Sequence, residues 1–253
     1  MKNYPTDLTE SQYATILAII GDKRKRQRSL KGVLDAIFYL LKTGCQWRML
    51  PSDFPKWELV YYYFNKWSHD GTLEQIHEVL RSRLRKKRGK ITSPSVGVID
   101  SQSIKTTKVA KEALGYDGGK RLKGRKRHIV TDTQGLLLAV DVHPANEHDS
   151  KSAFGVLEQL RWRFDRMKKI YADGGYRGQL SERVKNELGY EMEITLRSDK
   201  ATDFKPLPKR WVVERSFAWL GDFRRLAKDY ERTCNSAINM IYLAFIALMI
   251  NKL

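Results

Sequence analysis

Two short apolar segments of the chain each end in a single carboxylate. The segment VGVID ends at Asp100, and the segment KIYAD ends at Asp173. A third acid, Glu214, lies in RWVVERSFAWL, which is predicted to be helical. Because ligands of open α/β sheets collect at strand ends, the fold could bring the three acids together. Taken singly, each acid could equally be a solvated side chain or a helix cap.

Three carboxylates in one place would need cations. Two like charges about 4 Å apart repel by roughly 4 kcal/mol at an effective dielectric constant near 20. Two Mg²⁺ ions, or Mn²⁺ in their place, would relieve this repulsion, because Mg²⁺ accepts few protein carboxylates and completes its shell with water and substrate phosphate. Two such ions about 4 Å apart activate an attacking oxygen and stabilise the leaving oxygen at phosphorus. The acids therefore predict metal-dependent chemistry at phosphorus.

The elements that must position these acids fall into two regions. Residues 1–92 are predicted to be helical, and residues 93–253 are predicted to form an α/β domain with a mixed sheet. The boundary follows residues 81–90, of which seven of ten are Lys or Arg. In the second region we expect strands at 95–100, 168–173 and 191–197, a hairpin at 125–145 turning at 132–135, and helices at 149–164 (capped by Asp149 or Ser150), 178–189, 208–233 and 237–250.

The charge of the chain indicates a polyanionic partner. Lys and Arg total 47 against 29 Asp and Glu, a net charge of +18. Nucleic acid is the first candidate partner, an anionic membrane surface is the second, and a merely basic protein is the alternative. The two cysteines, Cys45 and Cys234, argue against a disulfide framework or a zinc ribbon and fit a reducing cytoplasm. We find no apolar signal core near the first residues, and the apolar run at 237–250 is too short for a membrane span.

Several cations and aromatic side chains are candidates for contact with DNA. The segment KRLKGRKR (residues 120–127) contains six cations in eight residues and favours DNA contact over a solvated hairpin edge. Trp211 could stack on an unpaired base, although packing with Val212 and Phe217 is the favoured interpretation. The cluster at 61–64 is expected to be helix core. The candidate DNA contacts are Lys105, Lys108, Lys123, Arg125, Lys126, Arg127, His148, Tyr176, Arg177, Arg210, Trp211, Arg215, Arg224 and Arg225.

Four stretches of the sequence together resemble the transposases of the insertion sequence five (IS five) family. They are VIDSQSIKTT, GRKRHIVTDTQGLLLAVDVHPANEHDS, IYADGGYRG and RWVVERSFAWLGDFRRLAKDYER, preceded by a helical half containing RSLKGVLDAIFYLLKTGCQWRMLP and FPKWELVYYYFNKW. The resemblance implies an RNase H-like DDE core whose catalytic acids are Asp100, Asp173 and Glu214. It also implies that the helical half binds DNA. A helix-turn-helix in this half could read the element ends, although no recognition helix can be assigned.

The surroundings of Glu214 depart from the signature of the wider relatives. That signature is Tyr, two residues, Arg, three residues, Glu, six residues, Lys. Arg210 and Glu214 match it, whereas Leu207 and Gly221 stand at the Tyr and Lys positions. Arg224 and Arg225, one turn later, could supply the missing charge. The departure concerns contacts to the cleaved DNA end rather than the metal site.

The segment ANEHDS matches a recurrent motif of the family. We expect Asn146, His148 and Asp149 to support the site, with capping of the following helix as the alternative for Asp149. The remaining histidines show no metal-ligand spacing and are expected to be structural or exposed; they are His69, His77, His128 and His143.

The function expected from the resemblance is Mg²⁺-dependent DNA transposition. Asp100 would bridge both ions, and Asp173 and Glu214 would each complete one site. Water would cleave the element end, and the freed 3′-hydroxyl would join to target DNA. The expected partners are the terminal inverted repeats and target DNA, bound by a dimer or larger assembly. The alternatives are a catalytically silent DNA-binding protein and a metal-dependent nuclease without strand transfer.

Overall fold

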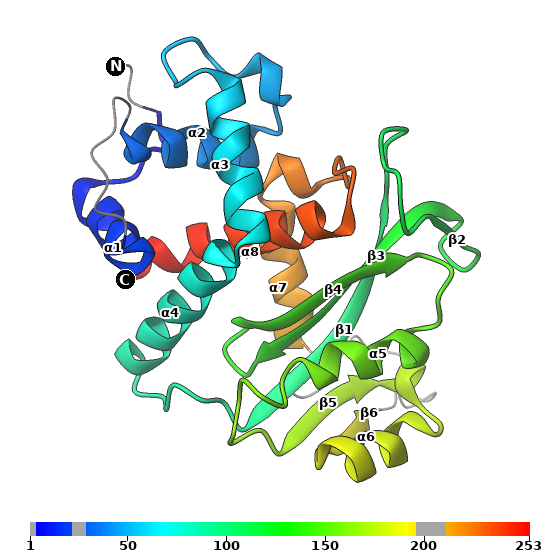
Figure 1. Cartoon of the computed structure of the whole chain (residues 1–253). Coiled ribbons are helices and arrows are strands. Elements are labelled where there is room, and N and C mark those ends of the chain that lie inside the picture. Colours follow the sequence, from blue (N-terminus) through cyan, green and yellow to red (C-terminus); the bar gives the residue numbers. More distant parts are fainter. Residues whose placement is uncertain (1–3, 22–28, 196–210) are drawn as a thin grey trace. The chain divides into compact units, whose positions relative to one another are not determined.

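The computed structural model describes residues 4–21, 29–195 and 211–253, which form two compact units (Figure 1). One unit comprises Met1–Lys90 and Leu220–Leu253, and the other comprises Ile91–Trp219. The predicted domains place the C-terminal residues differently, with the α/β region. The structure groups them with the N-terminal helices, because the apolar C-terminal helix buries its side chains there.

The first unit is helical, as predicted. Local sequence sets the helix ends: Thr9 and Gln12 form a reciprocal capping box at the start of α1, and Gly44 ends α2 with a left-handed φ of 72°. No helix in the described parts of the chain is long and apolar enough to cross a membrane. The elements of this unit are α1 (Glu10–Ile20), α2 (Leu30–Thr43), η1 (Trp47–Met49), α3 (Trp57–His69), α4 (Thr72–Lys87), η3 (Arg224–Leu226) and α8 (Cys234–Ile250).

The second unit is built on a six-stranded mixed sheet. Its long central hairpin turns where the sequence predicts, at Asp132, whose carboxylate accepts the backbone N–H groups of Gln134 and Leu136. The helix predicted at 208–233 is shorter, since α7 ends at Gly221; the residues predicted before Trp211 lie outside the described chain. The elements are β1 (Val96–Lys105), β2 (Gly115–Asp117), β3 (Leu122–Asp132), β4 (Leu137–Pro144), α5 (Asp149–Glu158), β5 (Lys169–Asp173), η2 (Gly174–Tyr176), α6 (Leu180–Leu188), β6 (Glu191–Thr195) and α7 (Trp211–Gly221).

The strand order explains how distant segments meet. Along its main path the sheet runs β4-β3-β1-β5-β6, with the short β2 also paired to β3. The hairpin strands are antiparallel to their neighbours, whereas β1, β5 and β6 are mutually parallel. This order and these directions are those of the RNase H-like fold, so the predicted fold class is confirmed.

The core of this unit lies between the sheet and the helices α5 and α6 (Figure 1). Ile99, Val130 and Ile170 point from three neighbouring strands into this core. Because side chains alternate along a strand, Asp100 and Asp173 point to the opposite face of the sheet from Ile99 and Ala172. The packed face therefore fixes the orientation of the two acids.

Candidate active site

The sheet register places Asp100 beside Asp173. Strands β1 and β5 pair in parallel, with Val98 opposite Tyr171. Continued two residues further along each strand, the same register sets Asp100, inside β1, level with Asp173, at the carboxyl end of β5. Neighbouring strands lie about 4.8 Å apart, and side chains level with one another point to the same face. The predicted pairing of these two acids therefore agrees with the observed register.

Backbone amides orient both carboxylates. The N–H of Ser101 donates to Asp100 Oδ1 at 2.7 Å. The N–H of Gly175 donates to Asp173 Oδ1 at 2.8 Å, where Asp173 caps the short helix η2. Such bonds fix the direction of a carboxylate. The two acids are thus held in fixed orientations.

Glu214 lies on α7, where its side chain is exposed. This helix is attached to the β3–β4 turn by bonds from Arg215 Nη2 to the Gln134 carbonyl and from Ser216 Oγ to the Gly135 carbonyl, both 3.0 Å. Within the described residues, no group of three or more His, Cys, Asp or Glu side chains is arranged so that it could hold a metal ion. The three predicted acids therefore do not form such a group in this structure.

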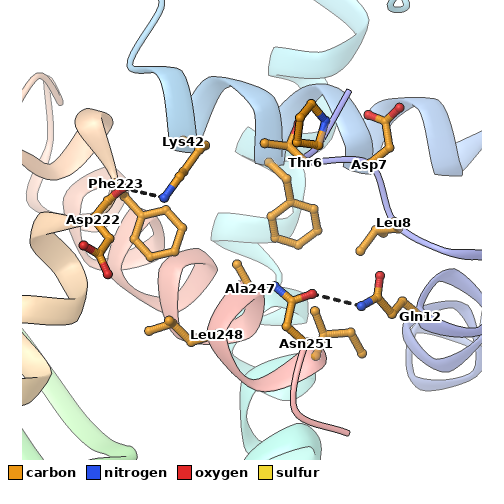
Figure 2. A pocket seen from close by; sticks show the side chains of 13 residues that line it. Thr6, Asp7, Leu8, Gln12, Lys42, Asp222, Phe223, Ala247, Leu248 and Asn251 are labelled. Atoms are coloured by element: carbon orange, nitrogen blue, oxygen red, sulfur yellow. Dashed lines mark hydrogen bonds between the residues drawn. The ribbon is translucent and has the colours of Figure 1, made fainter. Parts of the chain in front are cut away.

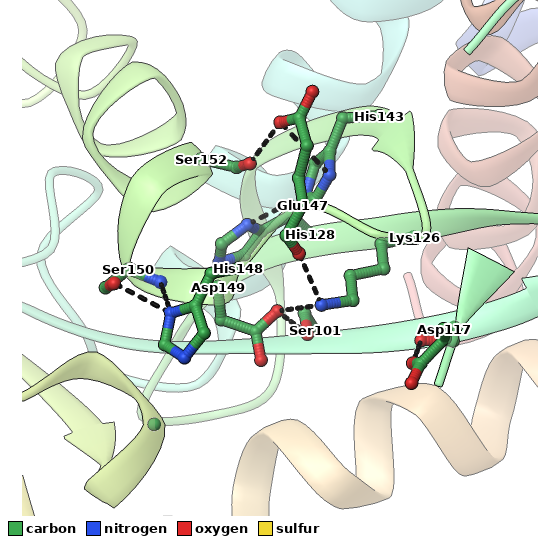
Figure 3. A network of polar contacts seen from close by, with 12 residues as sticks. Ser101, Asp117, Lys126, His128, His143, Glu147, His148, Asp149, Ser150 and Ser152 are labelled. Atoms are coloured by element: carbon green, nitrogen blue, oxygen red, sulfur yellow. Dashed lines mark hydrogen bonds and ion pairs between the residues drawn. The ribbon is translucent and has the colours of Figure 1, made fainter. Parts of the chain in front are cut away.

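A fourth acid, Asp149, contacts Ser101, the residue that follows Asp100 (Figure 3). Its Oδ1 accepts the hydroxyl of Ser101 at 2.7 Å and the ammonium of Lys126 at 2.9 Å. Burial works to raise the pKa of Asp149, but the hydrogen bonds from Lys126 and Ser101 outweigh it and leave the pKa below its usual value. The helix α5 is capped by His148 rather than by Asp149 or Ser150, since the His148 ring accepts the Ser150 N–H.

Buried aromatic side chains continue this network behind the acids. Tyr176 Oη lies 2.9 Å from His128 Nε2. His128 Nδ1 lies 3.3 Å from His143 Nε2 (Figure 3). Burial raises the pKa of Tyr176 well above its usual value, and the negative charges of Asp100, Asp149 and Asp173 raise it further. Burial, with the neighbouring His143, lowers the pKa of His128 to about 3, so this ring is neutral at pH 7.

The burial of several predicted DNA contacts corrects the sequence interpretation. Arg125 has no exposed surface and donates twice to the Glu112 carbonyl. Arg225 is paired with Glu231, and Tyr176 packs in the core. These side chains face protein groups rather than solvent. The buried candidates are Arg125, Lys126, Arg127, Tyr176 and Arg225.

The other predicted DNA contacts have exposed or partly exposed side chains. Trp211 is 45% exposed, so its predicted core packing is wrong; the Arg215 guanidinium lies 4.5 Å from its ring centre. In the cluster at 61–64, Phe64 is buried as expected, but Tyr61 and Tyr62 are exposed. Arg210 lies outside the described residues. The exposed candidates are Lys105, Lys108, Lys123, His148, Arg177, Trp211 and Arg224, with Arg215 half-buried.

The Lys126–Asp149 pair was missed by sequence reasoning. Lys126 belongs to a run of cations and was therefore assigned to the surface, yet its side chain is only 10% exposed. The available signal was its position in a strand that has neighbours on both sides, where a polar side chain needs a partner. The nearby ANEHDS motif supplied that partner, Asp149.

A separate cavity of about 270 Å³ lies in the helical unit (Figure 2). Lys42 Nζ donates to the Asp222 carbonyl at its edge, and Gln12 donates to Asn251 across it, both at 2.9 Å. Polar side chains such as Thr6 and Asp7 share the walls with the apolar side chains of Phe38, Phe223, Leu248 and Ile250. None of the three predicted catalytic acids lines this cavity.

Comparison with protein families identifies the class. The model described as “Transposase DDE domain” matches residues 91–250, and the model described as “Putative transposase of IS4/5 family” matches residues 8–77. The first match spans more than half of the chain. The chain therefore belongs to the family of transposases with a DDE domain, and the resemblance predicted from its motifs is confirmed.

Individual relatives agree with this family. The “Putative transposase for insertion sequence element IS402” of Burkholderia cepacia is 37% identical over 117 residues, 43% of this chain and 54% of the relative. The “Transposase for insertion sequence element IS1106” of Neisseria meningitidis serogroup B is 25% identical over 192 residues, 62% of this chain and 65% of the relative. The chain thus spans less than two thirds of the length of these curated relatives.

Solved structures were also compared. The catalytic domain of Mos1 mariner transposase is 11% identical, with a TM-score of 0.36, covering 71% of this chain and 89% of that one. The Mos1 strand transfer complex is 12% identical, with a TM-score of 0.33, covering 91% and 79%. At these scores no residue of this chain is matched to a residue of Mos1.

Proposed function

We propose that the protein is a transposase that binds insertion-sequence ends, cleaves DNA by metal-dependent phosphodiester hydrolysis and joins the 3′-hydroxyl to target DNA. The observation that carries the proposal is the register that sets Asp100 level with Asp173 on adjacent parallel strands. Family membership supports it, since the DDE domain model matches residues 91–250. Two oriented carboxylates on one sheet face are suited to chemistry at phosphorus.

The acid pair fits divalent metal ions in its donor chemistry. Carboxylate oxygens are the ligands that Mg²⁺ and Mn²⁺ prefer, and a backbone N–H fixes the direction of Asp100 and of Asp173. Asp100, Asp173 and Glu214 would hold two ions, Mg²⁺ or Mn²⁺. When bound, the ions lower the pKa of the attacking water and offset charge on the leaving oxygen. The three acids must come closer together on DNA, because they do not form a metal-binding group in the described structure.

The positive charge of the chain supports DNA as the partner. A net charge of +18 supplies the phosphate contacts that dominate DNA affinity. The exposed cations Lys105, Lys108, Lys123, Arg177 and Arg224 are the residues proposed to contact phosphates. We assign DNA-end binding to residues 1–92 and catalysis to residues 93–253. The reaction would take place in the bacterial cytoplasm, at the nucleoid, and pairing of two ends would require a dimer or larger assembly.

A strand-transfer assay tests this proposal. Purified protein is mixed with labelled duplexes of its element ends, a supercoiled target and Mg²⁺, in parallel with Asp100→Asn, Asp173→Asn and Glu214→Gln. The matched control is Asp165→Asn, which changes an exposed acid that accepts the Ser93 hydroxyl at 2.7 Å. We expect joined product that needs metal, is lost in the three site variants and persists in the control.

The other outcomes separate the alternatives. Tight end binding without cleavage by the intact protein would indicate a silent DNA-binding protein and would refute the proposal. Cleaved ends without joined product would indicate a nuclease that lacks strand transfer. DNA binding in every case should weaken with salt, with log affinity falling by about 0.9 per phosphate contact per log unit of salt.

A further inference from the structure

Asp149 and Lys126 form a partly buried ion pair at the edge of the acid pair (Figure 3). Their side chains are 30% and 10% exposed, and Lys126 Nζ lies 2.9 Å from Asp149 Oδ1. The same ammonium donates to the Glu147 carbonyl at 2.7 Å. Two acceptors therefore fix the lysine ammonium, and the lysine fixes one oxygen of Asp149.

Ser101 connects this ion pair to Asp100. Its hydroxyl donates to Asp149 Oδ1 at 2.7 Å, and its backbone N–H donates to Asp100 Oδ1 at 2.7 Å. One residue thus holds both carboxylates. Any movement of Asp149 shifts the hydroxyl of Ser101, and with it the amide that orients Asp100.

Asp149 also borders the second acid. A Cβ placed on Gly175 would lie 3.0 Å from Asp173 Oδ1 and 3.9 Å from Asp149 Oδ2. The two carboxylates therefore flank the same glycine. A third negative charge at this place is costly unless a cation offsets it, and Lys126 supplies that cation from the interior of the sheet.

We propose that Asp149 is a positioning residue of the catalytic site, which acts with Lys126 through Ser101 to orient Asp100 toward a divalent ion. This inference rests on the proposed function, because it assumes that Asp100 is a metal ligand. Groups behind metal ligands orient them, and their loss typically weakens metal affinity about 10- to 100-fold. Asp149 meets that description, because it contacts Ser101, whose backbone N–H holds Asp100, rather than Asp100 itself.

The test measures Mn²⁺ binding to the DNA-free protein by electron paramagnetic resonance, beside thermal unfolding. We expect Asp149→Ala to weaken Mn²⁺ binding at least about tenfold. Asp149→Asn should stay within about threefold of the parent protein, because its amide oxygen still accepts from Ser101 and Lys126. Asp165→Asn is the matched control and should leave Mn²⁺ binding unchanged, since this acid also accepts a serine hydroxyl but lies at the other end of β1.

The variant Ser101→Ala keeps the test valid if Asp149→Ala does not fold, and the double variant completes a double-mutant cycle. Ser101→Ala removes only one hydroxyl, and we expect the same weakening of Mn²⁺ binding, with no further loss in the Ser101→Ala/Asp149→Ala double variant. Equal Mn²⁺ binding by Ser101→Ala and the parent protein would overturn the proposal. Loss of binding in Asp149→Asn equal to that in Asp149→Ala would also overturn it, because Asp149 would then act as a charged ligand.

The parallel variant Asp100→Asn separates this inference from the proposed function. If Asp100→Asn removes Mn²⁺ binding while Asp149→Ala and Ser101→Ala do not affect it, the proposed function stands and this inference fails. If Mn²⁺ binds equally to the parent protein and to Asp100→Asn, or binds to neither, the proposed function and this inference both fail.

Discussion

A single methyl group added at Gly175 should displace one catalytic acid without unfolding the protein. The N–H of Gly175 holds Asp173 Oδ1, and a Cβ at this glycine would lie only 3.0 Å from the same oxygen. An ordinary carbon–oxygen contact begins near 3.4 Å, so the carboxylate must move by about 0.4 Å. The φ angle of Gly175 lies outside the left-handed region, and alanine therefore fits the backbone.

The size of the effect follows from the displacement. A misplacement of about 1 Å at a reacting group costs up to about 100-fold in rate. A shift of about 0.4 Å should then reduce DNA end cleavage by Gly175→Ala roughly five- to tenfold. Stability should change by less than about 0.5 kcal/mol, because Gly175 is exposed.

Gly174→Ala is the matched control, one residue earlier. Its Cβ would meet no atom closer than Arg177 Nη2 at 3.4 Å, an ordinary contact with a flexible side chain. Single-turnover cleavage of labelled end duplexes, with thermal unfolding of both variants, measures the difference. Equal cleavage rates for Gly175→Ala and Gly174→Ala would refute the assignment of Asp173 to the reacting centre.

Three further substitutions test the packing that supports the site. Gly124→Ala would put a methyl 1.9 Å from a backbone carbonyl oxygen of β1, so we expect about 3 kcal/mol or more of destabilisation in urea unfolding. Arg225→Met would remove the guanidinium partner of the buried Glu231 carboxylate and should cost about 3 kcal/mol by the same measurement. His128 takes up a proton near pH 6.5 when unfolded but only near pH 3 when folded, so stability should fall by about 1 kcal/mol per pH unit as pH decreases below 6.5. His128→Gln should reduce that slope, measured by urea unfolding at pH 7 and pH 5.

Each of these expectations has a clear contrary result. Gly155→Ala, in the open interior of α5, should be neutral or stabilising, and similar losses in Gly124→Ala and Gly155→Ala would contradict the close approach of β1 and β3. If the charge-conserving variant Arg225→Lys is as unstable as Arg225→Met, the geometry of the guanidinium rather than its charge stabilises the contact with Glu231. An unchanged pH slope in His128→Gln would show that other groups control acid unfolding.

Much of the fold was predictable because local patterns and tertiary packing agree. The segments around Asp100 and Asp173 are apolar and β-branched, and they form the strands predicted for them. The hairpin turn at Asp132 has the turn chemistry that its sequence indicates. Gly44 ends α2, since glycine adopts the left-handed φ of that position at no cost.

The burial of charged side chains was not predictable from local sequence. Arg125 and Lys126 lie in β3, which has β1 on one side and β4 on the other. Nothing in a run of cations shows that its strand will be central, because strand neighbours are set by segments far away in the chain. Cation content therefore predicted the partner of the protein better than it predicted which cations could contact that partner.

The same reasoning explains why the placement of two acids followed from sequence more readily than that of the third. Asp100 lies within β1 and Asp173 ends β5, and these parallel strands are held in register by a ladder of backbone hydrogen bonds. Glu214 lies on α7, which is attached to the β3–β4 turn by hydrogen bonds from Arg215 and Ser216 rather than by such a ladder. A helix held in this way is placed by tertiary contacts with segments far away in the chain, and local sequence does not show them.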